Sequence, residues 1–250
     1  MFKCPLPNLR LYNNEALKKW YLSIVYSDGF GDPCIAASYL EKSIEIFEKQ
    51  KNPVIDDAKK TFQNLKNKCS IEKSKREKEE QLISAATEGN ISAVKSIINE
   101  KTNINARAYN KGESALYNAA YTGDLEMVKF LIASGADVNI KTYSGVTPLM
   151  AAIYRENLDM VKYLISQKAS INAKDAKGET PLMYAVNSYS GKIAIQKLGG
   201  QSQSGMRDLE IIQFLISTGA DVNSRDEEGV SVLQKALGEA EKILKTHGAK

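Results

Sequence analysis

The sequence predicts an all-α repeat solenoid, in which pairs of short helices are joined by short β-hairpin turns. A repeat spacing and two repeated motifs predict this fold. Four asparagines recur at spacings of 34, 33 and 51 residues, the last being one 33-residue period plus an 18-residue insertion: Asn105, Asn139, Asn172 and Asn223. Thr-Pro-Leu begins two of these periods, at 147–149 and 180–182, and Gly-Ala-Asp-Val-Asn closes two, at 135–139 and 219–223. A fixed period of about 33 residues indicates stacked helical units that share one continuous core.

The Thr-Pro-Leu motif has a physical role at the start of a helix. Its hydroxyl caps a free backbone N–H, and proline fits the first helical turn. With this motif at this period, residues 76–250 resemble an ankyrin-repeat array of about five repeats. The resemblance implies the following boundaries: 76–107, 109–141, 142–174, 175–225 and a C-terminal cap at 226–250.

Several residues depart from the pattern or support it. Ser114-Ala115-Leu116 replaces Thr-Pro-Leu in the second repeat, and serine should cap the helix equally well. Glu156 and Lys168 stand where the pattern prefers glycine, and each should cost on the order of 1 kcal/mol if its backbone is left-handed. The repeat asparagines 139, 172 and 223 are expected to bond the backbone of the inter-repeat turns. Six apolar residues are predicted to form the core: Val128, Leu131, Val161, Leu164, Ile212 and Leu215.

The 18-residue insertion falls within residues 189–207, between the two helices of the fourth repeat. It contains no acidic residue, and the glycine- and serine-rich part at 199–205 is typical of a flexible linker. Long inserted loops are either functional or disordered, so two interpretations remain open. The segment is disordered and has no role, or it contacts a partner through Lys192, Lys197 and Arg207.

Residues 1–75 are predicted to form a separate N-terminal bundle of about three helices. Start signals for these helices lie at Asn14, at Asp32-Pro33 and at Asn52-Pro53. The second helix should bury one apolar stripe: Ile35, Tyr39, Leu40, Ile44 and Phe47. The charged residues 72–81 are expected to form a helical link or the polar start of the repeats.

The sequence offers no convincing catalytic, metal or cofactor site. Three cysteines (Cys4, Cys34 and Cys69) are an odd number without paired spacing, which argues against disulfides and for a reducing compartment. Cys34 lacks a nearby base, since the only histidine is His247. The segment 28–32 has too few oxygen ligands for calcium and no preceding strand for phosphate binding, so we expect a simple turn.

Composition excludes several classes of partner. A net charge of +4, from 34 basic and 30 acidic residues, is too small to indicate nucleic acid or an anionic membrane. No stretch of 18 apolar residues is present, and the N-terminus does not resemble a secretory signal. We therefore expect a monomeric chain located in the cytoplasm, or delivered into a host cytosol, with no small-molecule substrate.

The resemblance to ankyrin repeats implies that a partner protein docks on the concave side, formed by hairpin tips and first helices. Twelve positions there are predicted contacts: Tyr109, Lys111, Glu113, Tyr117, Tyr121, Tyr143, Val146, Tyr154, Arg155, Lys177, Glu179 and Asn187. Their five tyrosines would form an aromatic strip across repeats two and three, and tyrosine and arginine often carry binding energy. The alternative is that the tyrosines only cover the inner helices.

Three function classes follow from these observations. The first is an interaction module or adaptor, and by analogy a lysine-, asparagine- and isoleucine-rich chain of this kind is similar to bacterial effectors that act on host proteins. The second is a neutralising protein that blocks a cognate toxin or enzyme through the same surface. The third and least favoured is an enzyme whose activity resides in residues 1–75, because that segment lacks histidine and an acid–base pair.

Overall fold

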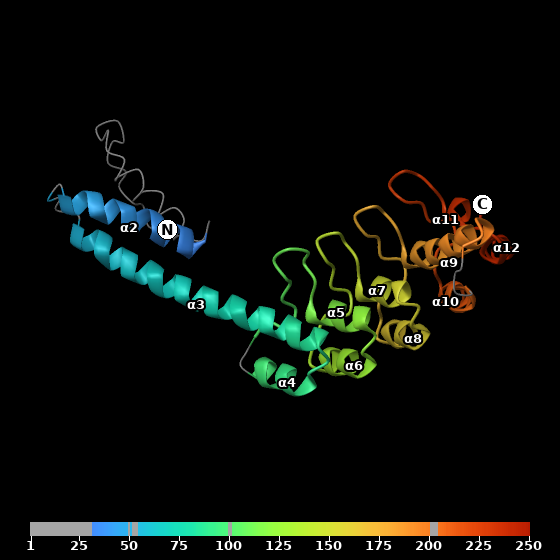
Figure 1. Ribbon diagram of the computed structural model, residues 1–250, viewed down its shortest axis with the longest axis horizontal. Helices are drawn as coiled ribbons and strands as arrows, with labels where there is room; N and C mark the ends of the chain where they lie inside the picture. Colours follow the sequence, from blue (N-terminus) through green and yellow to red (C-terminus); the bar gives the residue numbers. More distant parts are fainter. Residues whose placement is uncertain (1–31, 50, 52–54, 100–101, 201–204) are drawn as a thin grey trace. The chain divides into compact units, whose positions relative to one another are not determined.

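The computed structural model describes residues 32–49, 51, 55–99, 102–200 and 205–250. The chain divides into two compact units, Met1–Glu77 and Lys78–Lys250. The described residues form eleven helices and no sheet, so the all-α prediction is confirmed (Figure 1). The second unit is called the repeat array below.

The first unit contains α2 (Pro33–Lys49) and the beginning of α3 (Ile55–Thr87). The Asp32 carboxylate accepts a hydrogen bond from the Cys34 backbone N–H at 2.8 Å, which confirms the predicted helix start. α3 continues as a helix through the charged segment 72–81. The predicted starts at Asn14 and Asn52-Pro53 lie outside the described residues.

The buried face of α2 differs from the predicted stripe. Leu40 and Phe47 are fully buried, as predicted, but Ile35 and Tyr39 are 47% and 37% exposed. Ala36, Ala37 and Ser43 take the remaining buried positions, and the two alanines pack in one cluster with Ala58 and Leu65 of α3. Small residues on this face allow the two helices to approach closely. The prediction considered only large apolar residues and so missed these positions.

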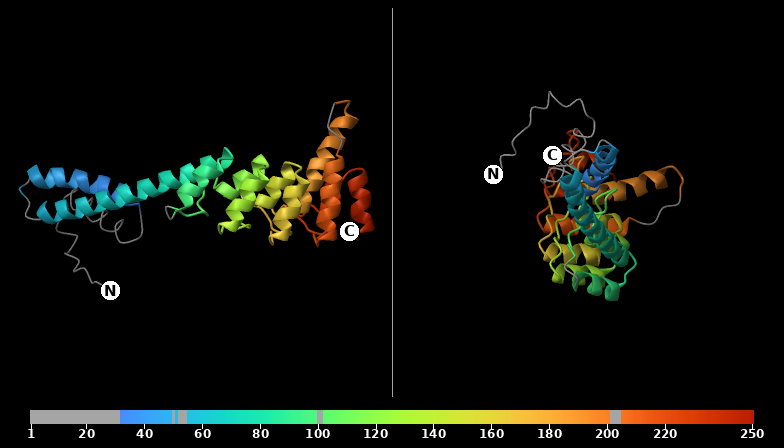
Figure 2. Two further views of the ribbon diagram at one scale, coloured as in Figure 1. Left: turned by 90° about the horizontal axis from the view of Figure 1, so that it is seen from below. Right: turned by 90° about the vertical axis from the view of Figure 1, so that its left-hand side faces the viewer.

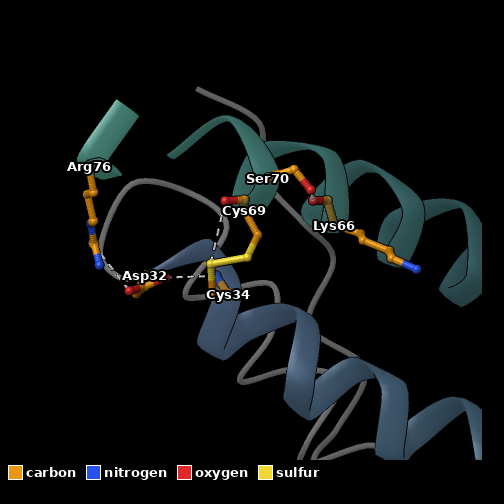
Figure 3. The surroundings of a disulfide bond; sticks show 6 residues. All are labelled: Asp32, Cys34, Lys66, Cys69, Ser70 and Arg76. Atoms are coloured by element: carbon orange, nitrogen blue, oxygen red, sulfur yellow. Dashed lines mark hydrogen bonds and ion pairs between the residues drawn. A yellow bond between two sulfur atoms is a disulfide. The ribbon is translucent and has the colours of Figure 1, made fainter. Parts of the chain in front are cut away.

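The structure contains a disulfide between Cys34 and Cys69, with an S–S distance of 2.04 Å and a Cα–Cα distance of 4.8 Å (Figure 3). The prediction that no disulfide forms was therefore wrong. α2 and α3 run antiparallel, since Glu48 also pairs with Lys59 at 2.8 Å, and this brings cysteines 35 residues apart side by side. Sequence spacing alone does not reveal such a pairing. The argument for a reducing compartment loses its basis.

The repeat array places first and second helices of successive repeats in two layers (Figure 1). The end of α3 supplies the first helix of the first repeat. The other first helices are α5 (Ala115–Thr122), α7 (Pro148–Tyr154), α9 (Pro181–Lys197) and α11 (Val232–Lys235). The second helices are α4 (Ile91–Asn99), α6 (Leu125–Ala133), α8 (Leu158–Ser166), α10 (Met206–Ser217) and α12 (Glu239–Thr246).

The predicted caps at Ser114, Thr147 and Thr180 and the predicted core are confirmed, and Ser231 is a further cap. Ser114, Thr147, Thr180 and Ser231 each accept a hydrogen bond from the backbone N–H three residues further on, at 3.1 to 3.4 Å. These bonds satisfy donors that the first turn of a helix leaves free. All six predicted core residues, from Val128 to Leu215, have no exposed side-chain surface.

The repeat asparagines join each repeat to the next. The side-chain oxygens of Asn105, Asn139, Asn172 and Asn223 accept bonds from the backbone N–H groups of Asp137, Ser170, Asp221 and Lys250, at 2.7 to 2.9 Å. The side-chain amides of Asn139, Asn172 and Asn223 also each donate a hydrogen bond to a backbone carbonyl of the next turn, at 3.2 to 3.4 Å. The predicted role of these asparagines is confirmed.

The hairpin turns of neighbouring repeats also touch. Backbone N–H groups of Tyr143, Ala176 and Glu227 donate to carbonyls in the preceding turn at 2.8 to 3.0 Å. Among described residues these turns contain two isolated β-bridges, at 107–114 and 225–231, and no longer ladder. The turns therefore approach so closely that a residue at their contact points has little space.

Gly145 is the clearest case. Its φ is +79°, and a Cβ there would lie 2.8 Å from the backbone nitrogen of Ala176. We expect Gly145→Ala to lower the free energy of unfolding by about 2 kcal/mol or more, because left-handed strain adds to a backbone clash. Gly229 has the same φ but nothing within 4 Å, so Gly229→Ala should cost only about 1 kcal/mol. Urea unfolding followed by circular dichroism measures both, and equal losses would contradict this reading.

The two departures from glycine in the third repeat have the predicted backbone. Glu156 and Lys168 have φ values of +56° and +67°. Left-handed backbone is unfavourable for both side chains. For Glu156 the structure shows a compensating contact, because its carboxylate bonds Lys192 in the insertion at 2.6 Å.

The described part of the insertion is largely helical, so the first of the two interpretations, disorder, does not hold for that part. α9 has 17 residues, whereas the equivalent helices α5 and α7 have 8 and 7. Figure 2 shows α9, drawn in orange, extending past the other first helices of the array. Gly199, at φ +79°, ends the helix, and the Gly200 N–H donates to the carbonyl of Ile195 at 3.0 Å. This is the bond of a glycine-terminated helix end.

Residues 189–192, at the base of the insertion, bond to three neighbouring parts of the array. Lys192 bonds Glu156 after α7 at 2.6 Å and Asp208 of α10 at 2.7 Å. The Ser190 hydroxyl accepts a bond from the Leu237 N–H, between α11 and α12, at 3.1 Å. Tyr189 is only 6% exposed. The linker interpretation rested on the glycines and serines at 199–205, which follow α9, whereas residues 189–197 belong to α9 and these long-range contacts hold them in place.

Candidate functional site

Three tyrosines stack on the surface formed by α5 and α7. The ring centroids of Tyr117 and Tyr121 are 6.3 Å apart, and those of Tyr121 and Tyr154 are 6.0 Å apart. The rings are nearly parallel, with interplanar angles of 12° and 11°. Tyr117 and Tyr121 are four residues apart and so share one helix face, while Tyr154 occupies the position of Tyr121 in the next repeat. We call these three residues the tyrosine stack.

The tyrosine stack is open to solvent on one side. Tyr121 and Tyr154 are 40% and 60% exposed, and the Arg155 guanidinium lies over the Tyr121 ring at 5.4 Å. Burial, and secondly the Glu113 carboxylate, raises the pKa of the Tyr117 hydroxyl. The Tyr117 hydroxyl is thus neutral at physiological pH and able to donate or accept a hydrogen bond.

The other two predicted tyrosines lie on the hairpin turns and form no ring contact with the stack in the described structure. Tyr143 is 57% exposed, and the Arg107 guanidinium lies over its ring at 5.3 Å. Tyr109 is 88% exposed. The single strip expected from the sequence is therefore two separate features, the stack and the turn residues.

The other predicted contact residues differ in how far they are exposed to solvent. Lys111, Lys177 and Arg155 are exposed, whereas Glu113 and Val146 are half-buried. These five residues lie on the hairpin turns and first helices, and their role as contacts stays a prediction.

Glu179 is occupied by bonds within the protein. Its carboxylate accepts bonds from Asn187 at 2.9 Å and Lys235 at 2.8 Å, and Lys235 also pairs with Asp226 at 2.9 Å. Burial alone would lower the pKa of Lys235, but the bonds to both carboxylates more than offset it and raise the pKa. This cluster joins the fourth repeat to the C-terminal cap, so we leave Glu179 out of the candidate surface, and exposed Asn187 stays only at its edge.

The three cations predicted in the insertion also differ. Lys192 is 15% exposed and already pairs with two carboxylates, so it is unsuited to the partner contact expected from the sequence. Burial would lower its pKa, but the bonds to Asp208 and Glu156 outweigh this and raise it. Lys197 and Arg207 are exposed.

Tyr184 is a site residue that the sequence reading missed. It lies on α9, and its hydroxyl donates a bond to Asp175 at 2.9 Å. Burial first, and then the bond to Asp175, raises its pKa far above the ordinary value, and the charge of Tyr117 also affects it. The repeat period could have indicated it, because Tyr184 is equivalent to Asn118 and Ala151 of the preceding first helices. In the structure Asn118 and Tyr184 are both half-exposed.

The described residues offer neither a metal-binding cluster nor a membrane-spanning helix. No group of three or more histidine, cysteine, aspartate or glutamate residues among them is arranged to hold a metal ion. Within the same part of the chain, no helix combines the length and apolar character that crossing a membrane requires.

Three protein-family models match the chain, and each of them describes ankyrin repeats. Ankyrin repeats (many copies) match residues 123–165 and 150–195, ankyrin repeats (3 copies) match 54–142, and a single ankyrin repeat matches 177–227. The comparison with curated proteins found no match. Ankyrin repeats are in general protein–protein interaction modules and typically serve as binding scaffolds without enzymatic activity. On the repeat geometry and these matches across residues 54–227, the chain belongs to the ankyrin-repeat family.

Proposed function

We propose that this chain binds a partner protein through the tyrosine stack and the exposed turns of repeats two and three. The observation that carries the proposal is the stack itself, in which Tyr121 and Tyr154 pack ring to ring while 40% and 60% of their surfaces remain exposed. Exposed aromatic residues in contact with arginine are the types that most often dominate interface energies.

The stack suits binding because its rings are already ordered. Each ring is held by a neighbour, so a partner that covers it causes little further loss of side-chain entropy. Arg155 adds a cation over Tyr121, and exposed Lys111 and Lys177 on the turns supply positive charge at the rim. Rim charges of this kind mainly affect association rate and specificity.

The biological role we propose is that of an adaptor, including an effector that acts on host proteins. A neutralising protein would use the same surface but would form a tight one-to-one complex with a single toxin or enzyme. The enzyme alternative loses one candidate residue, because the Cys34 sulfur is part of a disulfide and is not a thiolate nucleophile.

The experiment is affinity capture with three forms of the full chain, followed by titration of the recovered partner. Tyr121→Ala/Tyr154→Ala should weaken binding about tenfold or more, since it removes two exposed rings from the stack. The matched control is Glu126→Ala/Asp159→Ala, which changes exposed, equivalent residues on α6 and α8 in the other helix layer and should bind like the wild type. Equal binding by all three forms would refute the proposed surface.

A further inference from the structure

We propose that the insertion forms a second docking surface, independent of the tyrosine stack. At this surface Ile195 and Leu198, together with the exposed cations Lys197 and Arg207 of the same insertion, bind a partner protein that presents an apolar pocket with an acidic rim.

The end of α9 presents Ile195 and Leu198 in a defined conformation. α9 is helical through Lys197, and the Gly200 N–H closes its end on the carbonyl of Ile195 at 3.0 Å. At its base Lys192 is bonded to Glu156 and Asp208, at 2.6 and 2.7 Å. A projecting helix end that is already ordered binds with a smaller entropic loss than a flexible loop.

The insertion also holds the exposed aliphatic surface of the array. Leu198 is 88% exposed, Met206 66% and Ile195 48%, and the other large hydrophobic residues with this exposure in the described part of residues 78–250 are tyrosines. Ile195 and Leu198 are three residues apart at the end of one helix, so they lie on the same face. Apolar side chains gathered in this way on an otherwise polar surface indicate an interaction site.

Charge indicates the chemistry of the partner. Residues 189–207 contain no acid, and two of their cations are exposed: Lys197, next to Leu198 in the chain, and Arg207, which adjoins Asp208 at the start of α10. The carboxylate of Glu241 on α12 is within electrostatic range of Lys197, but it is bonded to Lys245 at 2.6 Å. A positive rim around an apolar centre is complementary to an acidic rim around an apolar pocket.

A protein pocket fits this surface better than a lipid bilayer or a second copy of the chain. Even a single fatty acyl chain gives only marginal membrane binding, and two aliphatic side chains offer less apolar surface than that. A second copy that docked the same face would bring Lys197 and Arg207 of both chains together, which like-charge repulsion opposes.

The test uses a displayed library of random peptides selected on the immobilised full chain, with prior depletion on the Ile195→Ser/Leu198→Ser variant. Recovered peptides should combine large apolar residues with aspartate or glutamate. Synthetic copies should bind that variant at least tenfold more weakly, and Lys197→Gln/Arg207→Gln several-fold more weakly. The control Tyr121→Ala/Tyr154→Ala should bind these peptides like the wild type, so failure here is distinguishable from failure of the proposed function.

Several results would overturn the proposal. Recovered peptides that lack acidic residues, or that bind the serine variant as tightly as the wild type, contradict it. Co-sedimentation with phosphatidylserine vesicles that the serine variant loses would assign the surface to lipid instead. A concentration-dependent dimer in sedimentation velocity, lost in the same variant, would assign it to self-association. Circular dichroism and the unfolding midpoint establish that each variant retains the fold.

Discussion

Replacing Lys192 with methionine should lower the free energy of unfolding of the repeat array by about 3 kcal/mol. Asp208 is 1% exposed, and Lys192, whose ammonium lies 2.7 Å from it, also pairs with Glu156. Removing one partner of a buried ion pair typically costs about 3–5 kcal/mol, because the remaining charge is left without compensation. We take the lower end since Glu156 and Lys192 are 24% and 15% exposed and so are partly hydrated.

Urea unfolding measures this loss, and two further variants identify its cause. Lys197→Met alters an exposed lysine on the same helix and should change stability by less than about 0.5 kcal/mol. Lys192→Met/Asp208→Asn should recover much of the loss, because it removes the isolated charge. If Lys192→Met were no more destabilising than Lys197→Met, the insertion would not be anchored as described.

The anchoring also depends on pH in a defined direction. The folded-state pKa of Lys192 is raised, so the protein gains stability from the pair wherever the unfolded lysine is protonated. This contribution is complete below the ordinary lysine pKa and is lost as pH rises through the raised value. Wild type and Lys192→Met should therefore become closer in stability above about pH 10.5.

Loss of the disulfide is the second large expected effect, and it concerns the first unit. A bond that closes a loop of 35 residues stabilises by about 4 kcal/mol in the chain-entropy description. Cys34→Ser/Cys69→Ser should therefore allow α2 and the first part of α3 to open far more readily than in the wild type. Hydrogen exchange of amides in α2 reports this opening, and the repeat array should show little change.

A control variant tests whether the effect is specific to this disulfide, and peptide mapping identifies which cysteines are linked. Cys4→Ser removes the cysteine that lies outside the described residues and should leave exchange in α2 unchanged. Peptide mapping without reductant, after the free thiol has been blocked, should recover Cys34 linked to Cys69. A linked peptide containing Cys4 would contradict the pairing. Reductant added to the wild type should reproduce the exchange of the double variant.

The features that could be predicted from the sequence are those that recur with the 33-residue period. Caps such as Thr147, turn asparagines such as Asn139 and core residues such as Val128 recur at one spacing, and local rules explain each of them. The pairing of Tyr121 with Tyr154 followed from the same period, because equivalent positions of adjacent repeats lie side by side.

The features that the sequence did not reveal depend on contacts between residues distant in the chain. Glu156 and Lys192 meet although they are 36 positions apart, and no local pattern records that pair. Glu179 was predicted as exposed because its repeat position usually is, but Lys235 of the cap reaches it. Cys34 and Cys69 meet only because two helices fold back on one another.

If the chain binds through the tyrosine stack, a partner covers the first-helix surface there. Hydrogen–deuterium exchange of the full chain, with and without the captured partner, tests it most directly. We expect slower exchange in peptides covering residues 109–122 and 143–155, with α6 and α8 unchanged. Protection confined to α6 and α8, with none over those two segments, would contradict it.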